Sequence, residues 1–320
     1  MRAGPTPPRP ADLYHLKPGN LSGAVVLGGT LAATLAGSWL SSREALLPWA
    51  LGQIVLALAL VEWFVVLHEC GHDTLFRAHA PHLPVGHLAG FFALIPFECW
   101  RPVHARHHRW TGWQDLDPTT ESLTPRPRGR CERWAVNVCW KYWIPIFSTT
   151  YRVDNFWNVP RLARFLRSDR RASRRVIANL TAQAAGYVIV AVLVGPRALA
   201  RGVGVALVLT FMIEDVLLLS QHTHLPVGLS HGRAVEPYSA LAQEPFTRSL
   251  RLPAWLSRVW LHFDAHELHH MYPFVPGHRL NDVGYVAANE VSWRQWVPAA
   301  RAIPGEVFLF QSRNESGVDV

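Results

Sequence analysis

Four long apolar runs constrain the fold of this chain most strongly. Each has close to the roughly 20 residues that a helix needs to cross a bilayer. A membrane interior offers no water to unpaired backbone groups, so such runs cross it as helices with internal hydrogen bonds. The 49% hydrophobic and 17% charged content fits a membrane protein better than a soluble enzyme. The runs are Leu21–Leu40, Ala45–Leu67, Val176–Val194 and Val203–Leu219.

A fifth apolar run, Leu83–Phe97, has the features of a segment that enters the membrane and returns. It has only 15 residues, includes His87, and is bracketed by Pro84 and Pro96. The predicted fold class is therefore an all-α integral membrane protein. It has four transmembrane helices in two hairpins, one re-entrant or interfacial segment, and a cytosolic helical cap.

Three histidine clusters carry the chemistry. They read HECGH (68–72), HARHH (104–108) and HELHH (266–270), and each sets imidazoles three or four residues apart, on one helix face. Imidazole suits zinc, copper, nickel or iron, and tetrahedral zinc takes only four ligands. The three clusters together hold eight histidines, which exceeds the need of one zinc ion and favours a dinuclear iron site.

The charge distribution predicts the orientation in the membrane. An even number of predicted crossings precedes each cluster, so all three share one membrane face. Between residues 98 and 175 there are 16 Lys and Arg against 7 Asp and Glu, which indicates the cytoplasmic side. Arg197 and Arg201 lie in the short connection that should face the opposite side, which argues against this orientation. The excess of basic residues between 98 and 175 is larger and is taken to determine the orientation. Both termini and the metal site are predicted to be cytoplasmic.

Composition divides the chain into three parts. Residues 1–20 are polar and proline-rich, with no evident cleavable signal, and are predicted to form a cytoplasmic arm. Residues 21–280 form the membrane domain. Residues 281–320 are predicted to be a cytoplasmic tail whose last ten residues are disordered. The four cysteines form no CxxC pair and are predicted to be reduced thiols.

The clusters and their surroundings resemble the membrane fatty acid desaturase superfamily, which also includes carotenoid hydroxylases and ketolases. The resemblance rests on HECGHDTLF, HARHHRWTG, QHTHLP and HELHHMYPFVPGHRL, in this order, and runs from about Ala45 to Leu280. It implies two iron ions and dioxygen as co-substrate. It implies a ninth ligand at the end of the last span, where either His222 or His224 would serve. The eight implied box ligands are His68, His72, His104, His107, His108, His266, His269 and His270.

Four other residues are candidates for orienting the ligands. Glu69 and Glu267 lie inside the boxes and are predicted to hydrogen-bond imidazole rings. Asp215 lies two helical turns before His222, and His262 lies four residues before His266, on what would be the same helix face. The acids inside the spans are expected to turn inward or to lie near the cytosolic end, because a charged group facing lipid is unfavourable.

Two other classes of protein, zinc peptidases and metal transporters, share part of the histidine pattern. HECGH and HELHH both satisfy the HExxH pattern of zinc peptidases, so an intramembrane zinc protease is a remote alternative. Such a protease gives no reason for a second HExxH or for HARHH. A metal transporter with histidine-rich loops would not explain the helical spacing of the boxes.

Desaturation of a fatty acyl chain of a lipid is the predicted activity, and hydroxylation or ketolation of a carotenoid or lipid is the alternative. Removing hydrogen from an unactivated methylene needs an oxidant made from dioxygen, which zinc cannot generate. The chain has no HPGG or GxGxxG motif, so an external ferredoxin, rubredoxin or cytochrome b5-like donor is expected. The loop that carries Arg126, Arg128 and Arg130 is its predicted dock. The basic stretch Arg164–Arg175 is interpreted first as a charge cluster that sets the membrane orientation, with contact to anionic lipid headgroups as the alternative and no nucleic acid as partner.

Overall fold

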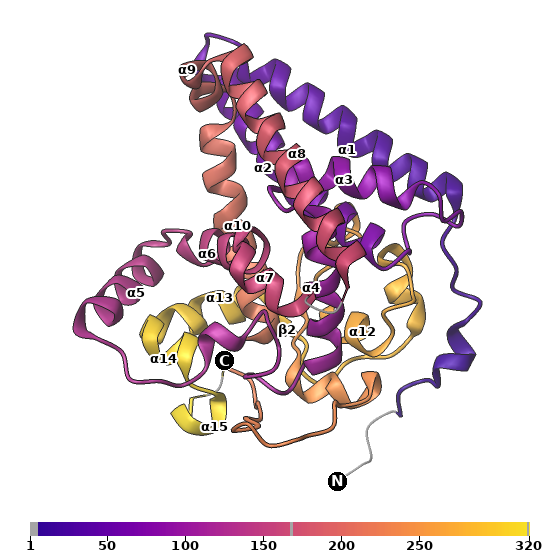
Figure 1. Ribbon diagram of the computed structural model, residues 1–320, viewed down its shortest axis with the longest axis vertical. Helices are drawn as coiled ribbons and strands as arrows, with labels where there is room; N and C mark the ends of the chain where they lie inside the picture. Colours follow the sequence, from indigo (N-terminus) through magenta and orange to yellow (C-terminus); the bar gives the residue numbers. More distant parts are fainter. Residues whose placement is uncertain (1–5, 167–168, 319) are drawn as a thin grey trace. The chain divides into compact units, whose positions relative to one another are not determined.

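The computed structural model describes residues 6–166, 169–318 and 320, and these are mostly helical (Figure 1). The chain forms two compact units. The first, here called the histidine unit, contains residues 1–17, 103–147 and 215–320, and the second, the span unit, contains residues 18–102 and 148–214. The described strands form one parallel pair, β1 (Leu250–Arg251) with β2 (Val291–Ser292), in the histidine unit.

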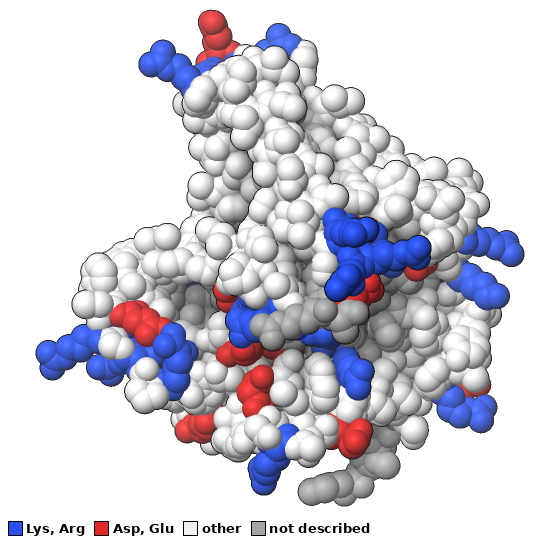
Figure 2. Space-filling view, viewed as in Figure 1, with Lys and Arg blue, Asp and Glu red and all other residues white. Residues whose placement is uncertain are grey.

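Four described helical segments are long and apolar enough to cross a membrane, which confirms the predicted number. On the face shown in Figure 2, the surfaces of α8 and α10 are white between the charged residues at their ends. These surfaces are suited to lipid contact. The four segments are α1 (Asn20–Ser41), α2 (Leu46–Gly71), α8 (Arg170–Val194) and the continuous run Pro196–His222, made of α9 (Pro196–Leu199), the π-helical η4 (Ala200–Gly204) and α10 (Val205–His222).

Helices α1 and α2 pack side by side as a close hairpin in the span unit (Figure 1). A methyl group added at Gly52 would overlap the backbone of Ser41, so glycine is needed where the helices approach. The Trp63 indole donates a 2.9 Å hydrogen bond to the Thr34 hydroxyl across the pair. Small residues and paired polar groups therefore replace the hydrophobic effect, which does not bring helices together in lipid.

The fifth apolar run forms a helix and a sharp corner, after which the helix of the second histidine box begins. Helix α3 (His82–Ala93) and helix α4 (Phe97–Trp110) meet at 93°. Leu94 adopts a left-handed conformation (φ 59°) at the corner, and Pro96 follows it. The guanidinium Nε of Arg152 donates to the Ala93 carbonyl at 3.0 Å, which ties this corner down. Pro96 lies at this bend, whereas Pro84 lies in the first turn of α3, and the return of this segment to the same membrane face stays a prediction.

The same arginine pairs with an acid inside the last span. Arg152 ends α6 (Ile146–Arg152), and its guanidinium lies 2.6 Å from a carboxylate oxygen of Glu214 on α10. Glu214 is fully buried, as the expectation that the acids in the spans turn inward requires. The π-helical turn η3 (Val153–Trp157) and helix α7 (Val159–Leu166) lead from α6 toward α8. A buried ion pair thus joins three segments of the span unit.

The histidine unit is built from short elements. Its 3-10 turns are η1 (Pro10–Leu13), η2 (Glu121–Leu123), η5 (Ala240–Phe246) and η6 (Gly277–Val283). Its helices are α5 (Arg130–Tyr142), α11 (Ala254–Val259), α12 (His266–Met271), α13 (Trp293–Ala302), α14 (Gly305–Phe310) and α15 (Arg313–Ser316), together with parts of α4 and α10.

Both ends of the chain contribute to the core of this unit, which the sequence did not predict. Leu13 and Leu16, from the part predicted to be a polar arm, are buried beside Met271 and Leu280. Phe308 of α14 is fully buried and stacks on Trp140 of α5. The expectation of disorder from residue 311 was wrong for the described residues, since α15 forms there. These segments are short, so their burial depends on tertiary packing.

Candidate metal centre

Four histidines from three helices form one compact group in the histidine unit. One ring nitrogen from each residue lies within 4.8 Å of the others. Helix α4 supplies His107, α10 ends on His222, and α12 supplies His266 and His270 one turn apart. The Nε2 atoms of His222 and His266 are only 2.7 Å apart. Four converging imidazole nitrogens match the donor set of a transition-metal ion.

Three more box histidines form a second group in the same unit. The Nε2 atom of His108 lies 3.0 Å from Nε2 of His104 and 3.0 Å from Nε2 of His269. His104 and His269 are buried, and His108 is partly buried. Since α4 and α12 each contribute to both groups, the i, i+3 and i+4 spacing of two boxes serves two adjacent clusters of nitrogens.

The first box lies in the span unit, at the end of α2. The rings of His68 and His72 are one helical turn apart, with centroids at 4.8 Å. The Trp100 indole meets His68 edge-on at 5.6 Å between ring centroids. A methyl group added at Gly71 would overlap this indole. The glycine of HECGH therefore lets an aromatic ring pack against the histidine pair.

Two side chains determine which ring nitrogen of His107 and of His270 faces the other histidines of the four-histidine group. The Nδ1 of His107 lies 2.8 Å from a carboxylate oxygen of Asp117, and the Nδ1 of His270 lies 2.9 Å from the amide oxygen of Gln243. Both acceptors favour the tautomer with the proton on Nδ1, which leaves the Nε2 lone pair available. The Nε2 of His270 is buried and has no hydrogen-bond partner among the described residues.

The electrostatics of the group also suit a metal ion. Burial and, to a lesser extent, the neighbouring imidazoles hold the pKa of His270 well below its usual range. A neutral imidazole keeps its lone pair, which coordination requires. A buried nitrogen with an aligned lone pair and no protein partner is what a bound metal would satisfy, so the residues present fit a metal centre.

The two glutamates of the boxes make different contacts. Glu69 lies beside its own box, with one carboxylate oxygen 3.4 Å from His68 Nδ1 and the other accepting from the Thr74 hydroxyl at 2.8 Å. Glu267 instead accepts from the backbone N–H groups of Ser249 at 3.0 Å and Asn289 at 2.7 Å. Its predicted hydrogen bond to an imidazole is replaced by contacts that join the segments leading into β1 and β2. Burial raises the pKa of Glu267 to about 7.

The predicted helix face for His262 was wrong. Helix α11 ends at Val259 and α12 begins at His266, so a spacing of four residues does not correspond to a helical turn here. His262 has a left-handed backbone (φ 54°), and its Nδ1 lies 2.8 Å from the Ser257 hydroxyl. Its ring supports the turn between the helices.

The structure separates the two candidates for the ninth ligand. His222 joins the four-histidine group. His224 lies beyond the end of α10 with a left-handed backbone (φ 58°), and its ring nitrogens lie 3.1 Å and 3.0 Å from the carbonyl oxygens of Gln311 and Val318. His222 is therefore favoured over His224 as the ligand. Asp215 is buried in α10, and its support of the metal centre stays a prediction.

Asp117 and Gln243 were not among the predicted site residues. Asp117 follows HARHH by nine residues in the loop WTGWQDLDPTT, where a carboxylate close behind a histidine box is a usable signal. Gln243 lies in η5, far from any box in sequence, and its side chain reaches both His270 and the His108 carbonyl. Nothing in its local sequence marks it.

A mostly helical fold with membrane-length apolar helices and clustered imidazoles defines a histidine-box membrane protein, and comparison with known proteins identifies the family. The family model for fatty acid desaturase matches residues 44–296, so the chain belongs to this family. It is 33% identical over 119 residues to the sn-1 oleoyl-lipid 12-desaturase of Picosynechococcus, an alignment that covers 36% of this chain and 33% of that protein.

Two further relatives extend this comparison. The chain is 26% identical over 278 residues to the probable fatty acid desaturase DES1 of Sorghum bicolor, covering 80% of this chain and 66% of that protein. It is 29% identical over 101 residues to the Delta(12) fatty acid desaturase of Mortierella alpina, covering 30% and 25%. The chain thus spans from a quarter to 66% of the lengths of the three relatives it matches here.

Proposed function

We propose that this protein is a dioxygen-dependent di-iron desaturase that introduces a double bond into a fatty acyl chain of a lipid. The four-histidine group carries the proposal, because four converging nitrogens, two of them with fixed tautomers, form a site for a redox metal. The family match agrees with it. Two of the three relatives described above have names that specify a 12-desaturase, which supports an acyl lipid as the substrate.

The proposed ligands are the eight box histidines and His222. Bound iron would activate dioxygen, whose four-electron reduction to two water molecules would take two hydrogen atoms, with their two electrons, from the acyl chain, and two electrons with two protons from an external donor and the solvent. The protein's own contribution is to bind and orient. Asp117 and Gln243 hold the Nδ1 protons of His107 and His270, and burial keeps water away from the four-histidine group. His68 and His72 remain in the ligand set on the sequence resemblance.

The zinc-peptidase alternative loses one of its two candidate general bases, the glutamate of HELHH. In that mechanism the glutamate of HExxH acts as a general base beside the metal. Glu267 accepts hydrogen bonds from two backbone N–H groups, those of Ser249 and Asn289, which hold its carboxylate in a structural role. Hydroxylation of a lipid or carotenoid is the alternative that product analysis separates from desaturation.

We place the metal site on the cytoplasmic face, where a soluble electron donor can reach it. The excess of basic residues between 98 and 175 supports this orientation. Arg126 and Arg130 are exposed and suit an acidic donor such as a ferredoxin, rubredoxin or cytochrome b5-like protein. Arg128 is buried instead, with its guanidinium 3.1 Å from the ring centroid of Phe310, so it is removed from the predicted dock.

Product and metal analysis test the proposal together. The wild-type protein is expressed in a host that lacks desaturases but supplies a reduced donor, and the acyl chains are analysed by mass spectrometry. We expect new double bonds and about two irons per chain. His270→Ala should abolish both, while His231→Ala, on an exposed turn outside the boxes, should change neither. Oxygenated products, or full activity of His270→Ala, would contradict the proposal.

A further inference from the structure

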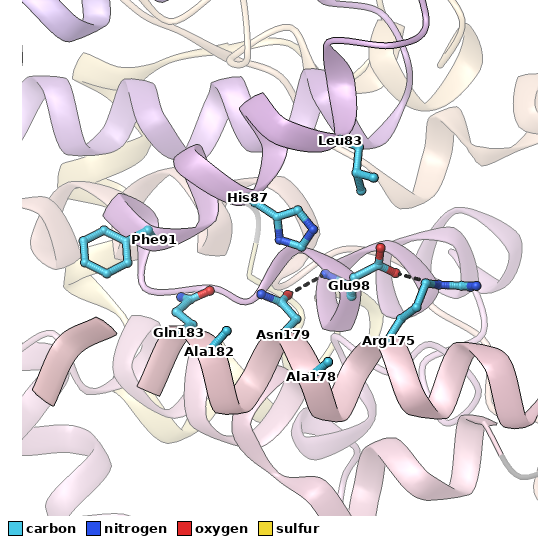
Figure 3. Close-up of a pocket in the computed structure, with 9 residues that line it drawn as sticks. All are labelled: Leu83, His87, Phe91, Glu98, Arg175, Ala178, Asn179, Ala182 and Gln183. Carbon is cyan, nitrogen blue, oxygen red and sulfur yellow. Dashed lines mark hydrogen bonds and ion pairs between the residues drawn. The ribbon is translucent and has the colours of Figure 1, made fainter. Parts of the chain in front are cut away.

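A cavity of about 560 Å³ opens between α3 and α8 in the span unit (Figure 3). Its volume lies within the roughly 300–1,000 Å³ of typical ligand pockets. One wall is α3 and the other is α8, with Glu98 of α4 at one end. The residues that line it are Leu83, His87, Phe91, Glu98, Arg175, Ala178, Asn179, Ala182 and Gln183.

The middle of the cavity is mostly apolar, with His87 and Asn179 as its polar side chains. Ala178 and Ala182 are one turn apart on α8 and carry only methyl groups, so they leave a channel along the helix. Figure 3 shows Phe91 closing one end above Gln183, whose amide nitrogen donates to the Gly90 carbonyl at 3.0 Å. Because α8 is a membrane-spanning helix, this channel lies where acyl chains are the surrounding solvent.

The other end of the cavity is positively charged. The Nε of Arg175 lies 3.3 Å from a carboxylate oxygen of Glu98, and the Arg175 side chain is 54% exposed. That contact uses one of the five guanidinium donors. Arg171 lies one helical turn before Arg175, Arg174 is its neighbour in the sequence, and both are exposed. Figure 2 shows a group of blue side chains where α8 begins. Around the start of α8, Arg170, Arg171, Arg174 and Arg175 outnumber the acids Asp169 and Glu98, so the net positive charge at this end suits an anion.

We propose that this cavity binds an anionic phospholipid of the surrounding bilayer. One acyl chain lies along Ala178 and Ala182 toward Phe91, and the phosphate lies at the outward-facing amino groups of Arg175. Arginine binds phosphate by parallel N–H···O contacts, and a basic residue at the hydrocarbon boundary naturally reaches the headgroups. A soluble anion would leave the apolar channel unfilled, and a neutral lipid would not use the arginines. The lipid is a resident ligand that is not consumed.

Native mass spectrometry of metal-free protein in nanodiscs measures this binding independently of any desaturation. Discs contain either phosphatidylglycerol or phosphatidylcholine. The wild type should retain phosphatidylglycerol preferentially, and Arg175→Gln should lower that retention about tenfold, as expected for loss of a charge-assisted contact. Ala182→Phe should also abolish retention by filling the channel. Ala184→Phe, the same change on the opposite face of α8, is the matched control and should retain lipid.

Three results would overturn the proposal. The first is equal retention by Arg175→Gln and wild type, and the second is equal loss from Ala182→Phe and Ala184→Phe. The third is the appearance of new double bonds in the retained lipid after turnover of iron-loaded protein, since that would make it a substrate. Thermal unfolding of each variant verifies its folding, and Arg175→Gln keeps the test decisive if Ala182→Phe is unstable. A protein that retains lipid without desaturating would leave this inference intact while the proposed activity fails.

Discussion

Two rings of the four-histidine group are oriented by different kinds of side chain. Asp117 gives His107 a charged acceptor and Gln243 gives His270 a neutral one. A charged acceptor makes the opposite nitrogen a stronger donor to a metal. His107 and His270 therefore differ in electronic character although both come from similar boxes.

Replacing Asp117 by alanine should weaken iron binding about 10- to 100-fold, the usual effect of removing a group that orients a metal ligand. Iron per chain after dialysis against graded chelator concentrations measures this. Asp115→Ala is the matched control, because Asp115 accepts hydrogen bonds from Ser230 and His231 instead of a ring in the group. Unchanged iron retention in Asp117→Ala would show that its carboxylate does not position His107.

Replacing Gln243 by leucine should lower iron retention and turnover, since Nδ1 of His270 loses its acceptor in a buried place. Gln243→Glu should recover most of the loss, because a carboxylate also accepts from Nδ1. Spectroscopy of the iron site distinguishes a changed ligand from a destabilised fold. A Gln243→Glu protein as impaired as Gln243→Leu would point to the contact with the His108 carbonyl instead.

The histidines could be predicted from the sequence, but the residues that orient them could not. Spacing of three or four within one helix is a local property, so the boxes are visible in sequence. Gln243 in η5 contacts His270 in α12, 27 residues later in the sequence, and no local pattern encodes such a contact. His262 shows that a sequence pattern can also mislead. The spacing of four residues between His262 and His266 predicted one helix, but α11 ends at Val259 and α12 begins only at His266.

At the scale of elements, we expect substitutions in the buried ion pair between α6 and α10 to destabilise the fold strongly. Arg152→Met would leave the Glu214 carboxylate without this guanidinium in the interior, at a cost of about 3–5 kcal/mol. The double change Arg152→Met with Glu214→Leu should recover much of the stability, because no charge then stays buried. Thermal unfolding in detergent compares the three proteins. A double variant no more stable than the single one would refute this.

Long elements were predictable and short ones were not. The four spans follow from apolar length alone, and α2 agrees with its predicted run to within a few residues. Helix α14 has only six residues and no long apolar run, and it is stabilised by burial of Phe308 against α5. No element was predicted for this segment, because tertiary burial of a single aromatic ring leaves no periodic signal.

At the scale of the whole molecule, the two units interleave along the sequence. The chain passes from one to the other within α4, between Pro102 and Val103, and within α10, between Glu214 and Asp215. Composition predicted three consecutive parts because it follows polarity along the chain. Compactness depends on long-range contacts: Leu13 and Leu16 pack with buried residues between 268 and 287, and Phe308 stacks on Trp140.

Docking of the electron donor depends on the charge of a whole surface, here the one that carries Arg126 and Arg130. The double variant Arg126→Gln with Arg130→Gln should slow reduction by an acidic donor several-fold at low salt and have little effect at high salt, where the Debye length falls to about 3 Å at 1 M. Stopped-flow reduction across a salt series measures this. Arg197→Gln, on the connection predicted to face the other side, is the control. A rate that ignores both salt and these substitutions would eliminate this surface as the dock.

The contact between Gly71 and the Trp100 indole restricts protein engineering. Even alanine, the smallest replacement, would push the indole off the imidazoles of the first box. A directed-evolution library that aims to alter chain-length selectivity should therefore keep Gly71 unchanged and vary other positions.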